Sequence, residues 1–279
     1  MISAYNAALL SDIGVLILGS LSVYVILSTG QLSLGNAGFM AIGAYLASYL
    51  SVEQRLPITL ALLASATGCA AIGIFIGFPA LRLRGIYLAV ATLGFGEMVR
   101  SFFLNLEHLG GAGGYHGMQP IGAEYIWTWT AGVLLLVLIL EKSRIWLDIR
   151  AVHDDETAAG LVGLDATSIK VGAFGLGAFI AGLAGGLFAH HHLYIEPGNF
   201  GTERSIEFVL ATILGGSTLA IGSIIGSALL VLLPEWLQFM ADWRLAAFGA
   251  MLVFMLLVRP QGLLDRRMFR WPALRKQEV

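Results

Sequence analysis

An uncharged polar stretch at 28–38 interrupts an otherwise apolar part of the sequence. It holds three glycines together with the amides of Gln31 and Asn36 and the hydroxyl of Ser33. Because these hydrogen-bonding groups are too polar for contact with lipid, we expect a helix interrupted inside the protein, where the freed backbone groups face a cavity or are met by these side chains. The alternative is a plain cytoplasmic turn, with Gly as the C-cap and Asn36 as the N-cap.

A related small and polar pattern returns at 214–223, where Gly215 and Ser217 stand between two apolar runs. Residues 41–44 and 220–223 can be aligned, as an internal duplication would produce, and Gly215 and Ser217 are candidates to line a pathway through the protein. The alternative is that the small residues let two helices approach closely.

Glu97 and Arg100 are opposite charges within the apolar run 86–104, and their spacing places them on one face of a helix. Either charge alone would cost about 2.5 to 3.5 kcal/mol at the centre of a bilayer. Pairing and a position near the outer end of the span reduce that cost. The pair is either a gate or docking contact at the outer mouth or, as we favour, a structural ion pair that orients the helix.

The loop 150–164 combines acidic residues with small apolar ones. Asp154 or Asp155 can cap a short helix, Glu156 suits its first turn, and Gly163 can end it in the left-handed conformation. Ala158, Ala159 and Val162 would then form an exposed apolar knob on the cytoplasmic side. We expect this knob to bind in a groove of a partner protein. The alternative, a helix resting on lipid, is disfavoured because the acidic first turn would meet an anionic leaflet.

Three consecutive histidines, His190, His191 and His192, invite the interpretation of a metal site. Consecutive helical residues point about 100° apart, so the three rings cannot readily share one ion, and spacing of four leaves only His192 with Glu196. We therefore expect a polar cap at the membrane surface, with no metal and no cofactor bound by this chain.

Elements that position these residues must be membrane helices. Of the 279 residues 57% are hydrophobic and 12% charged, with a mean hydropathy of +0.81, whereas soluble domains carry roughly 25% charged residues. Continuous apolar runs of about twenty residues predict helices and not a β-barrel. We expect an all-α, polytopic transmembrane bundle of eight or nine segments, the short ones broken or re-entrant. The candidate spans are 13–29, 37–50, 58–79, 86–104, 123–141, 171–191, 206–219, 221–238 and 245–258.

Most basic residues fall in three loops separated by even numbers of spans, which puts all three in the cytoplasm. The N-terminus then lies outside and the C-terminus inside. Since the first twelve residues hold no Lys or Arg, we expect the first span to be retained rather than removed as a signal peptide. The basic residues concerned are Arg82, Arg84, Lys142, Arg144, Arg150, Lys170, Arg259, Arg266, Arg267, Arg270, Arg275 and Lys276.

The whole chain, 1–279, is expected to be a single transmembrane domain with a cytoplasmic loop at 142–170 and a basic cytoplasmic tail at 259–279. No lysine follows a glycine, so the chain lacks a phosphate-binding G-x-x-x-x-G-K motif. If ATP drives this protein, a partner binds it. A net charge of −2 gives no indication of nucleic-acid binding.

The runs TGQLSLGNAGFMAIGAY at 29–45 and LRGIYLAVATLGFGEMVR at 83–100 resemble the branched-chain amino-acid ABC transporter permease family, in its LivM-like branch. Matching segments at 150–163, 181–186, 214–216 and 259–263, and Lys170, extend the resemblance over nearly the whole chain. The chain departs from the family pattern at 146–149 and in its histidine cluster. Thr92, within the second run, joins Gln31, Ser33, Asn36, Gly215 and Ser217 as a candidate to line the pathway.

The resemblance implies a permease subunit, not an enzyme, in a bacterial inner-membrane importer that works by alternating access. Its implied partners are a LivH-like permease, two cytoplasmic ATPases that hold ATP and Mg, and a periplasmic or lipid-anchored solute-binding protein. It also implies that 154–163 is the coupling helix. Branched-chain or hydrophobic amino acids are the implied substrate, with urea, amides or another small solute as the alternative. A stand-alone secondary transporter or channel is the alternative of another class.

Overall fold

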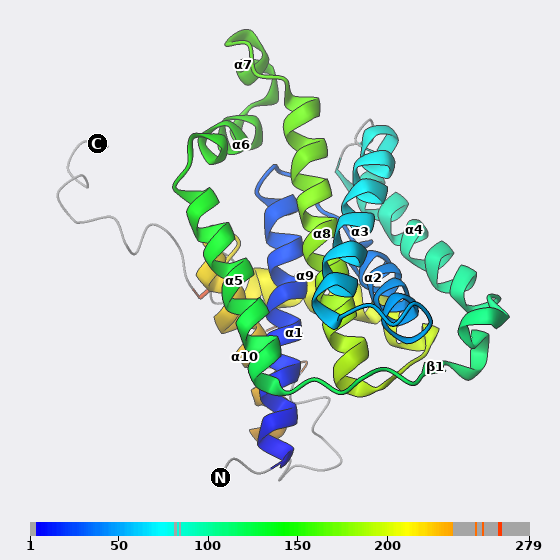
Figure 1. The fold of residues 1–279 in the computed structure, drawn as a ribbon. Helices are drawn as coiled ribbons and strands as arrows, with labels where there is room; N and C mark the ends of the chain where they lie inside the picture. Colours follow the sequence, from blue (N-terminus) through cyan, green and yellow to red (C-terminus); the bar gives the residue numbers. More distant parts are fainter. Residues whose placement is uncertain are drawn as a thin grey trace.

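The computed structural model describes residues 4–80, 83, 85–236, 249, 253 and 262–263. The expected ninth span at 245–258 and the basic tail at 259–279 lie almost wholly outside these residues, as do Arg82 and Arg84. The described chain is a bundle of helices (Figure 1).

Among the residues that the structure describes, five helices are long and apolar enough to cross a membrane. They are α1 (Ala4–Leu27), α3 (Ile58–Ala80), α4 (Ile86–Leu104), α5 (Ala123–Glu141) and α8 (Ala166–His192). Each overlaps one of the expected spans: α3, α4, α5 and α8 contain theirs, whereas α1 ends at Leu27, two residues before the expected end at 29, and α1 and α8 begin several residues earlier than the apolar pattern indicates. The polytopic helical bundle predicted from composition is therefore confirmed.

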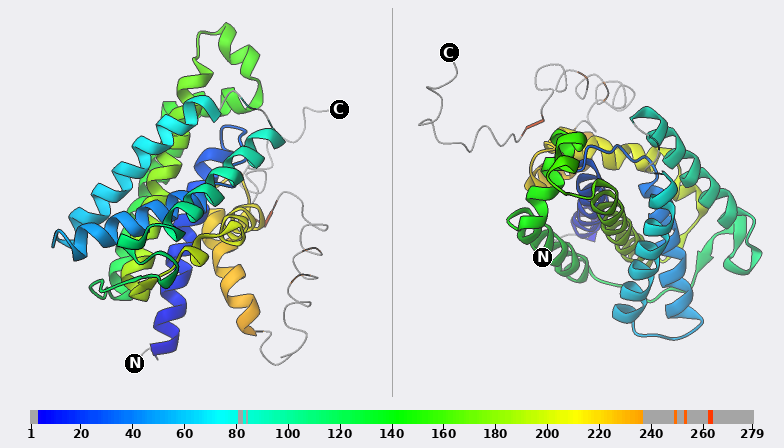
Figure 2. Two further views of the ribbon diagram at one scale, coloured as in Figure 1. Left: turned by 90° about the vertical axis from the view of Figure 1, so that its right-hand side faces the viewer. Right: turned by 90° about the horizontal axis from the view of Figure 1, so that it is seen from above.

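The two central helices, α1 and α8, lie side by side and are largely buried, with α2 and α3 against one flank and α5 against the other (Figures 1 and 2). Small residues make this close packing possible. A Cβ on Gly43 of α2 would lie 2.1 Å from the carbonyl oxygen of Gly182 in α8. A Cβ on Gly185 would lie 1.9 Å from the carbonyl oxygen of Met40. Any side chain at either glycine would push α2 away from α8.

The described part of the bundle also contains the shorter helices α2 (Asn36–Val52), α9 (Thr202–Gly215) and α10 (Ala220–Trp236). The last two meet at an angle of 117° across a break of four residues, as in a broken span or a re-entrant loop. The expectation that the short segments are broken or re-entrant is confirmed for this pair.

The two ends of the bundle differ (Figure 1). At one end α6 (Arg144–Asp154) and α7 (Glu156–Leu161) project beyond the long helices. The N-terminus of α1 lies at the opposite end, where β1 (Tyr115–His116) pairs antiparallel with β2 (Tyr194–Ile195). This ribbon has no counterpart in the sequence prediction, because two-residue strands leave no periodic signal. Three short 3-10 helices accompany it: η1 (Glu107–Leu109), η2 (Gly111–Gly113) and η3 (Pro197–Phe200).

Candidate functional site

The segment 28–35 leaves the end of α1 and runs back into the interior of the bundle, where α2 begins. Thr29, Gln31, Ser33 and Asn36 are all buried. The Thr29 hydroxyl donates to the carbonyl of Ile26 and to Oε1 of Gln31. An exposed turn between two spans would leave these side chains in water. The helix is instead interrupted inside the protein, with Gly35 and not Asn36 at the N-cap position of α2.

Neighbouring helices supply the hydrogen bonds that this interruption requires. The Leu34 N–H donates to the Thr92 hydroxyl of α4 at 3.0 Å, and the Ala37 N–H donates to the Ser205 hydroxyl of α9 at 3.1 Å. The side-chain amide of Asn36 donates to the Ser22 hydroxyl of α1 at 2.8 Å. Hydroxyls from α4 and α9 thus accept hydrogen bonds from backbone N–H groups at the break, and a hydroxyl from α1 accepts from the Asn36 side chain, because an unpaired polar group in an apolar interior is costly.

Sequence reasoning did not find Ser22 and Ser205. Ser22 lies within an apolar run and Ser205 beside one, and only the fold shows that they face the start of α2. Of the six pathway candidates, Gln31, Ser33, Asn36 and Thr92 therefore gather where α1, α2, α4 and α9 meet. Lining of a translocation pathway by these four remains a prediction.

The other two candidates lie at the break between α9 and α10. Gly215 is packed so closely that a Cβ would lie 1.8 Å from the carbonyl oxygen of Gly222, which favours close helix approach as its role. Ser217 is exposed and lines a hollow of about 310 Å³ with Tyr24, Ser28 and Arg150. This hollow lies between the end of α1, the helix α6 and the break.

Glu97 and Arg100 form the expected ion pair, with 2.9 Å between Oε2 and Nη1. The other carboxylate oxygen of Glu97 accepts hydrogen bonds from the hydroxyl of Thr202 at 2.6 Å and from its backbone N–H at 3.2 Å. Thr202 is the first residue of α9. Glu97 therefore binds the N-terminus of α9 as well as Arg100, a contact that spacing along α4 alone could not reveal.

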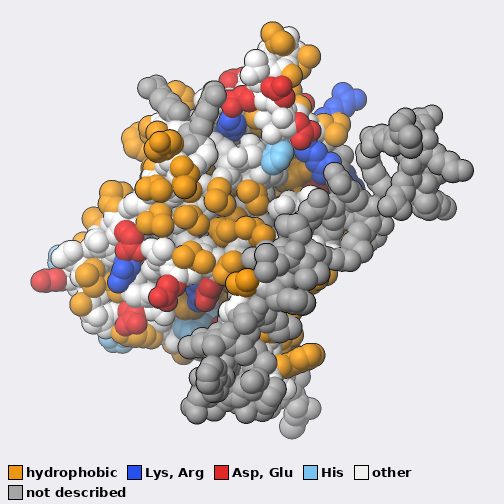
Figure 3. Space-filling model, turned by 180° about the vertical axis from the view of Figure 1, so that it is seen from behind, with side chains coloured by type: hydrophobic (Ala, Val, Ile, Leu, Met, Phe, Trp, Pro, Cys, Tyr) orange, Lys and Arg blue, Asp and Glu red, His pale blue; other side chains and the backbone are white. Residues whose placement is uncertain are grey.

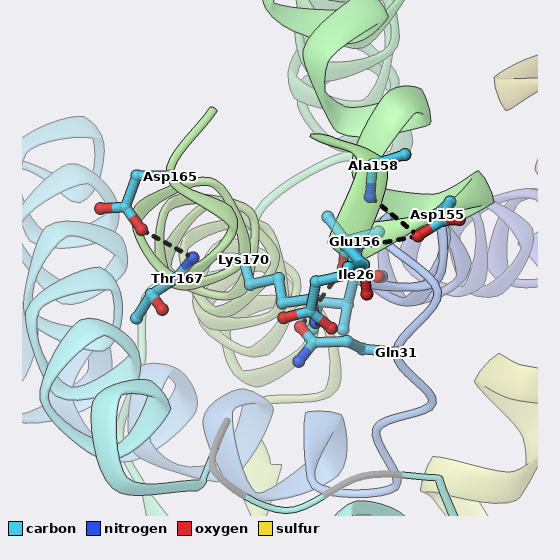
Figure 4. A network of polar contacts seen from close by, with 10 residues as sticks. Ile26, Gln31, Asp155, Glu156, Ala158, Asp165, Thr167 and Lys170 are labelled. Carbon is cyan, nitrogen blue, oxygen red and sulfur yellow. Dashed lines mark hydrogen bonds and ion pairs between the residues drawn. The ribbon is translucent and has the colours of Figure 1, made fainter. Parts of the chain in front are cut away.

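The short helix α7 forms as expected. Asp155 is its N-cap, and Oδ1 accepts hydrogen bonds from the N–H groups of Thr157 at 2.8 Å and Ala158 at 3.0 Å (Figure 4). Gly163 has a φ of +89°, the left-handed conformation predicted for the residue that ends the helix. Asp154 is exposed and lies at the last position of α6.

One expectation about the apolar knob is wrong. Ala159 is buried, because its side chain faces inward when Asp155 caps the helix. The exposed apolar tip consists instead of Leu161 and Val162, with 86% and 77% of their surfaces exposed, beside the exposed Ala158. The tip lies at the far end of the α6–α7 projection.

Two contacts tie this projection to the bundle. Lys170 of α8 pairs with Glu156 of α7, with 2.7 Å between Nζ and Oε2 (Figure 4). Gly30 packs against His153 of α6, since a Cβ on Gly30 would lie 3.4 Å from the ring nitrogen Nδ1. Asp165 caps α8 through the N–H of Thr167, and a hydrogen bond from the Ser168 hydroxyl lowers the pKa of this carboxyl. The α6–α7 unit thus contacts both the central helix and the interrupted segment.

The expected polar cap at the surface forms only in part, because His192 is exposed and His191 half-buried, whereas His190 is not at the surface. His190 is fully buried and its ring contacts the Ser51 hydroxyl and the carbonyl of Gly186. His191 and His192 lie beside Asp12 of α1, with one ligand atom from each residue within 4.8 Å of the others. Asp12 is 179 positions from His191 along the chain (191 − 12 = 179), so spacing within the cluster could not have indicated it.

Comparison with known proteins gives a consistent match. The family model described as "Branched-chain amino acid transport system / permease component" matches residues 5–258. The chain is 35% identical over 292 residues to the high-affinity branched-chain amino acid transport system permease protein LivM of Salmonella typhimurium, covering 89% of this chain and 67% of that protein.

Two further relatives are more distant. A probable branched-chain amino acid transport permease protein LivM of Methanocaldococcus jannaschii is 24% identical over 273 residues, covering 85% of this chain and 76% of that protein. The permease protein LivH of Escherichia coli is 29% identical over 146 residues, covering 50% of this chain and 46% of that protein. No solved structure matches significantly.

Proposed function

This chain belongs to the branched-chain amino acid transport permease family, and we propose that it is one of two paired permease subunits of an ATP-driven importer for branched-chain and other hydrophobic amino acids. Relatives named LivM and LivH both match the chain, which supports pairing with a LivH-like permease. The importer lies in the bacterial cytoplasmic membrane and works by alternating access.

The observation that carries this proposal is the exposed tip of α7. Leu161 and Val162 expose most of their apolar surfaces at the end of a projection that is capped and salt-bridged to the bundle. A rigid apolar tip of this kind fits the groove of a partner protein. We assign this partner as one of two cytoplasmic ATPases, which hold the ATP and Mg, with one docked on each permease.

This projection carries the basic residues Arg144 and Arg150 and is flanked by Lys142 and Lys170, which supports a cytoplasmic location for it. The N-terminus and the β1–β2 ribbon then face the outside, where a solute-binding protein delivers the substrate. The C-terminal tail is assigned to the cytoplasm from its own basic residues.

The contacts of the α6–α7 unit supply a route for coupling. Movement of α7 acts on α8 through Glu156 and Lys170, and on the interrupted segment through His153 and Gly30. The same unit borders the second break at Ser217. A shift of this unit therefore reaches both interruptions of the bundle, which are the places where helices can reorient without losing continuous hydrogen bonding.

Co-purification after mild solubilisation tests the proposal, followed by uptake of radiolabelled L-leucine into proteoliposomes. We expect the chain to be recovered with a second permease and ATPases, and uptake to require ATP. Recovery of the chain alone, with uptake that needs no ATP, would instead support a stand-alone transporter or channel. Competition of leucine uptake by urea or amides would reassign the substrate class.

A further inference from the structure

A cleft with charges of both signs opens on the outer half of the bundle, between α4 and the start of α9. Its volume is about 580 Å³, and Glu97, Arg100, Asn199, Arg204 and Glu207 are among the residues that line it. In Figure 3 acidic and basic side chains gather at the lower left, below a broad hydrophobic band. A charged cluster beside apolar surface is expensive unless it faces water, a ligand or another protein.

Two ion pairs stand in this cleft. Arg100 binds Glu97 at 2.9 Å, and Arg204 binds Glu207 at 2.8 Å between Nη1 and Oε2. Each guanidinium uses one nitrogen for its carboxylate, although an Arg side chain carries five N–H donors in all. Among the described residues both arginines therefore keep donors for a further anion. The Arg204 guanidinium is also held over the ring of Phe188, at 5.2 Å from the ring centroid, so its position is fixed.

Depth in the membrane makes the cleft functionally relevant. Glu97 and Arg100 lie seven and four residues before Leu104, the last residue of α4, or about 10 and 6 Å at ~1.5 Å per residue. The charges thus lie inside the outer part of a span. A solute that arrives from outside meets them before it meets the interrupted segment.

A second hollow of about 570 Å³ adjoins the cleft and shares Asn199, Arg204 and Glu207 with it. Apolar side chains make up much of its lining, namely Leu9, Val15, Leu16, Phe188, Leu210 and Leu230, while Asp12, His192 and Glu235 add polar groups to it. Both volumes lie in the range of small-molecule sites, roughly 300 to 1,000 Å³. The two hollows together offer a carboxylate site, an ammonium site and an adjoining apolar chamber.

We infer that this pair of hollows is the outer substrate site of the permease itself, and that it binds the zwitterionic head of an amino acid with its aliphatic side chain in the apolar chamber. Donors of Arg100 and Arg204 receive the substrate carboxylate, while Glu207 receives the ammonium group. The inference rests on the proposed function and deepens it, because it places substrate recognition in this chain as well as in a delivery protein.

A reporter cysteine in the reconstituted transporter tests this site. The chain has a single native cysteine, Cys69, which is buried. The variant Glu203→Cys introduces an exposed thiol at the cleft, and Glu107→Cys, in the exposed outer loop, is the matched control. Both are labelled from outside with a membrane-impermeant thiol reagent, without a binding protein, so that added L-leucine meets the permease directly.

L-leucine should slow labelling at Glu203→Cys and leave Glu107→Cys unaffected. Leucine amide lacks the carboxylate and 4-methylpentanoate lacks the ammonium group. Each should need a concentration at least about tenfold higher for half-protection, because one charge-assisted contact is lost. Adding Arg204→Gln should raise the half-protecting concentration of L-leucine by a similar factor, and Arg204→Lys by less. The analogues test the site in the reporter variant even where an Arg204 variant fails to fold.

Equal protection by L-leucine and both analogues would overturn the inference, since the cleft would then not recognise charge. If the transporter imports leucine but L-leucine does not slow labelling at Glu203→Cys, the inferred site is wrong while the proposed function stands. Protection without ATP-driven uptake would keep the site and overturn the proposed function.

Discussion

Lys170, near the start of α8, donates to Glu156, the first residue of α7, with 2.7 Å between Nζ and Oε2. A helix of six residues is not stable alone in water. The Asp155 cap and this ion pair therefore fix α7 against α8, one of the two central helices of the bundle. Force applied to α7 reaches the core through this contact.

Breaking the ion pair between Lys170 and Glu156 should weaken the mechanical link between α7 and α8. Lys170→Met removes the charge of a side chain that is only 13% exposed and leaves Glu156 unpaired, so we expect ATP-driven leucine uptake to fall several-fold. The partly exposed pair is worth about 0.5 to 1 kcal/mol of coupling energy, measured by a double-mutant cycle of thermal unfolding with Glu156→Gln. If the stability losses of the two single variants add up to that of the double variant, Lys170 and Glu156 do not stabilise each other.

The cap of α7 offers a sharper test. Asp155→Ala removes the acceptor for two N–H groups, which costs about 1 kcal/mol of local helix stability. Hydrogen exchange over residues 156–161 should accelerate and ATPase stimulation by substrate should fall. Asp155→Asn keeps an acceptor and serves as the matched control. Equal exchange in the two variants would contradict the role given to the cap.

Thr92 should be needed for the interrupted segment. In Thr92→Val the partly buried Leu34 N–H loses its acceptor, which costs about 1 kcal/mol or more, so the thermal midpoint of the purified complex should fall. Thr92→Ser keeps the hydroxyl, so its thermal midpoint should stay close to that of the wild type. The control Thr128→Val removes a hydroxyl that bonds only within α5, at an exposed position, and should change little. A Thr92→Val midpoint equal to wild type would show that the break does not depend on this bond.

Two Gly-to-Ala substitutions, one at the close contact of α2 with α8 and one on an open face of α5, should change the free energy of unfolding in opposite directions. Gly43→Ala places a Cβ 2.1 Å from the carbonyl oxygen of Gly182, and overpacking of this kind costs about 1 to 3 kcal/mol. Gly132→Ala in α5 meets nothing within 4 Å and should gain about 0.5 to 1 kcal/mol from helix propensity. Thermal unfolding in one detergent compares them. A neutral Gly43→Ala would contradict the packing described.

Much of the fold follows from local sequence. Continuous apolar runs locate α1, α3, α4, α5 and α8, because lipid requires helices of nearly fixed length. The polar stretch around Gln31 predicts an interruption, since no lipid-facing helix tolerates it. The Asp155 cap and the ion pair of Glu97 with Arg100 are also predictable, because both depend on residues a few positions apart.

What the sequence does not reveal depends on contacts between distant segments. The burial of Ala159 depends on how the short helix α7 packs in the folded protein, and the approach of Asp12 to His191 joins residues 179 positions apart (191 − 12 = 179). Thr202 and Ser205 look like ordinary residues at a helix start, yet they bind Glu97 and the first turn of α2. No periodic pattern in the sequence indicates such contacts, because they depend on how the helices pack.

The most direct test of the account replaces the α7 tip. Variants Leu161→Glu and Val162→Glu, with Leu56→Glu at the opposite end of the bundle as control, are reconstituted with their partners. ATP hydrolysis and leucine uptake are then measured in the same vesicles. We predict that both tip variants fold but lose ATP-driven uptake and association with the ATPases, while the control retains both. Tip variants that still import leucine with ATP at the wild-type rate would contradict the account.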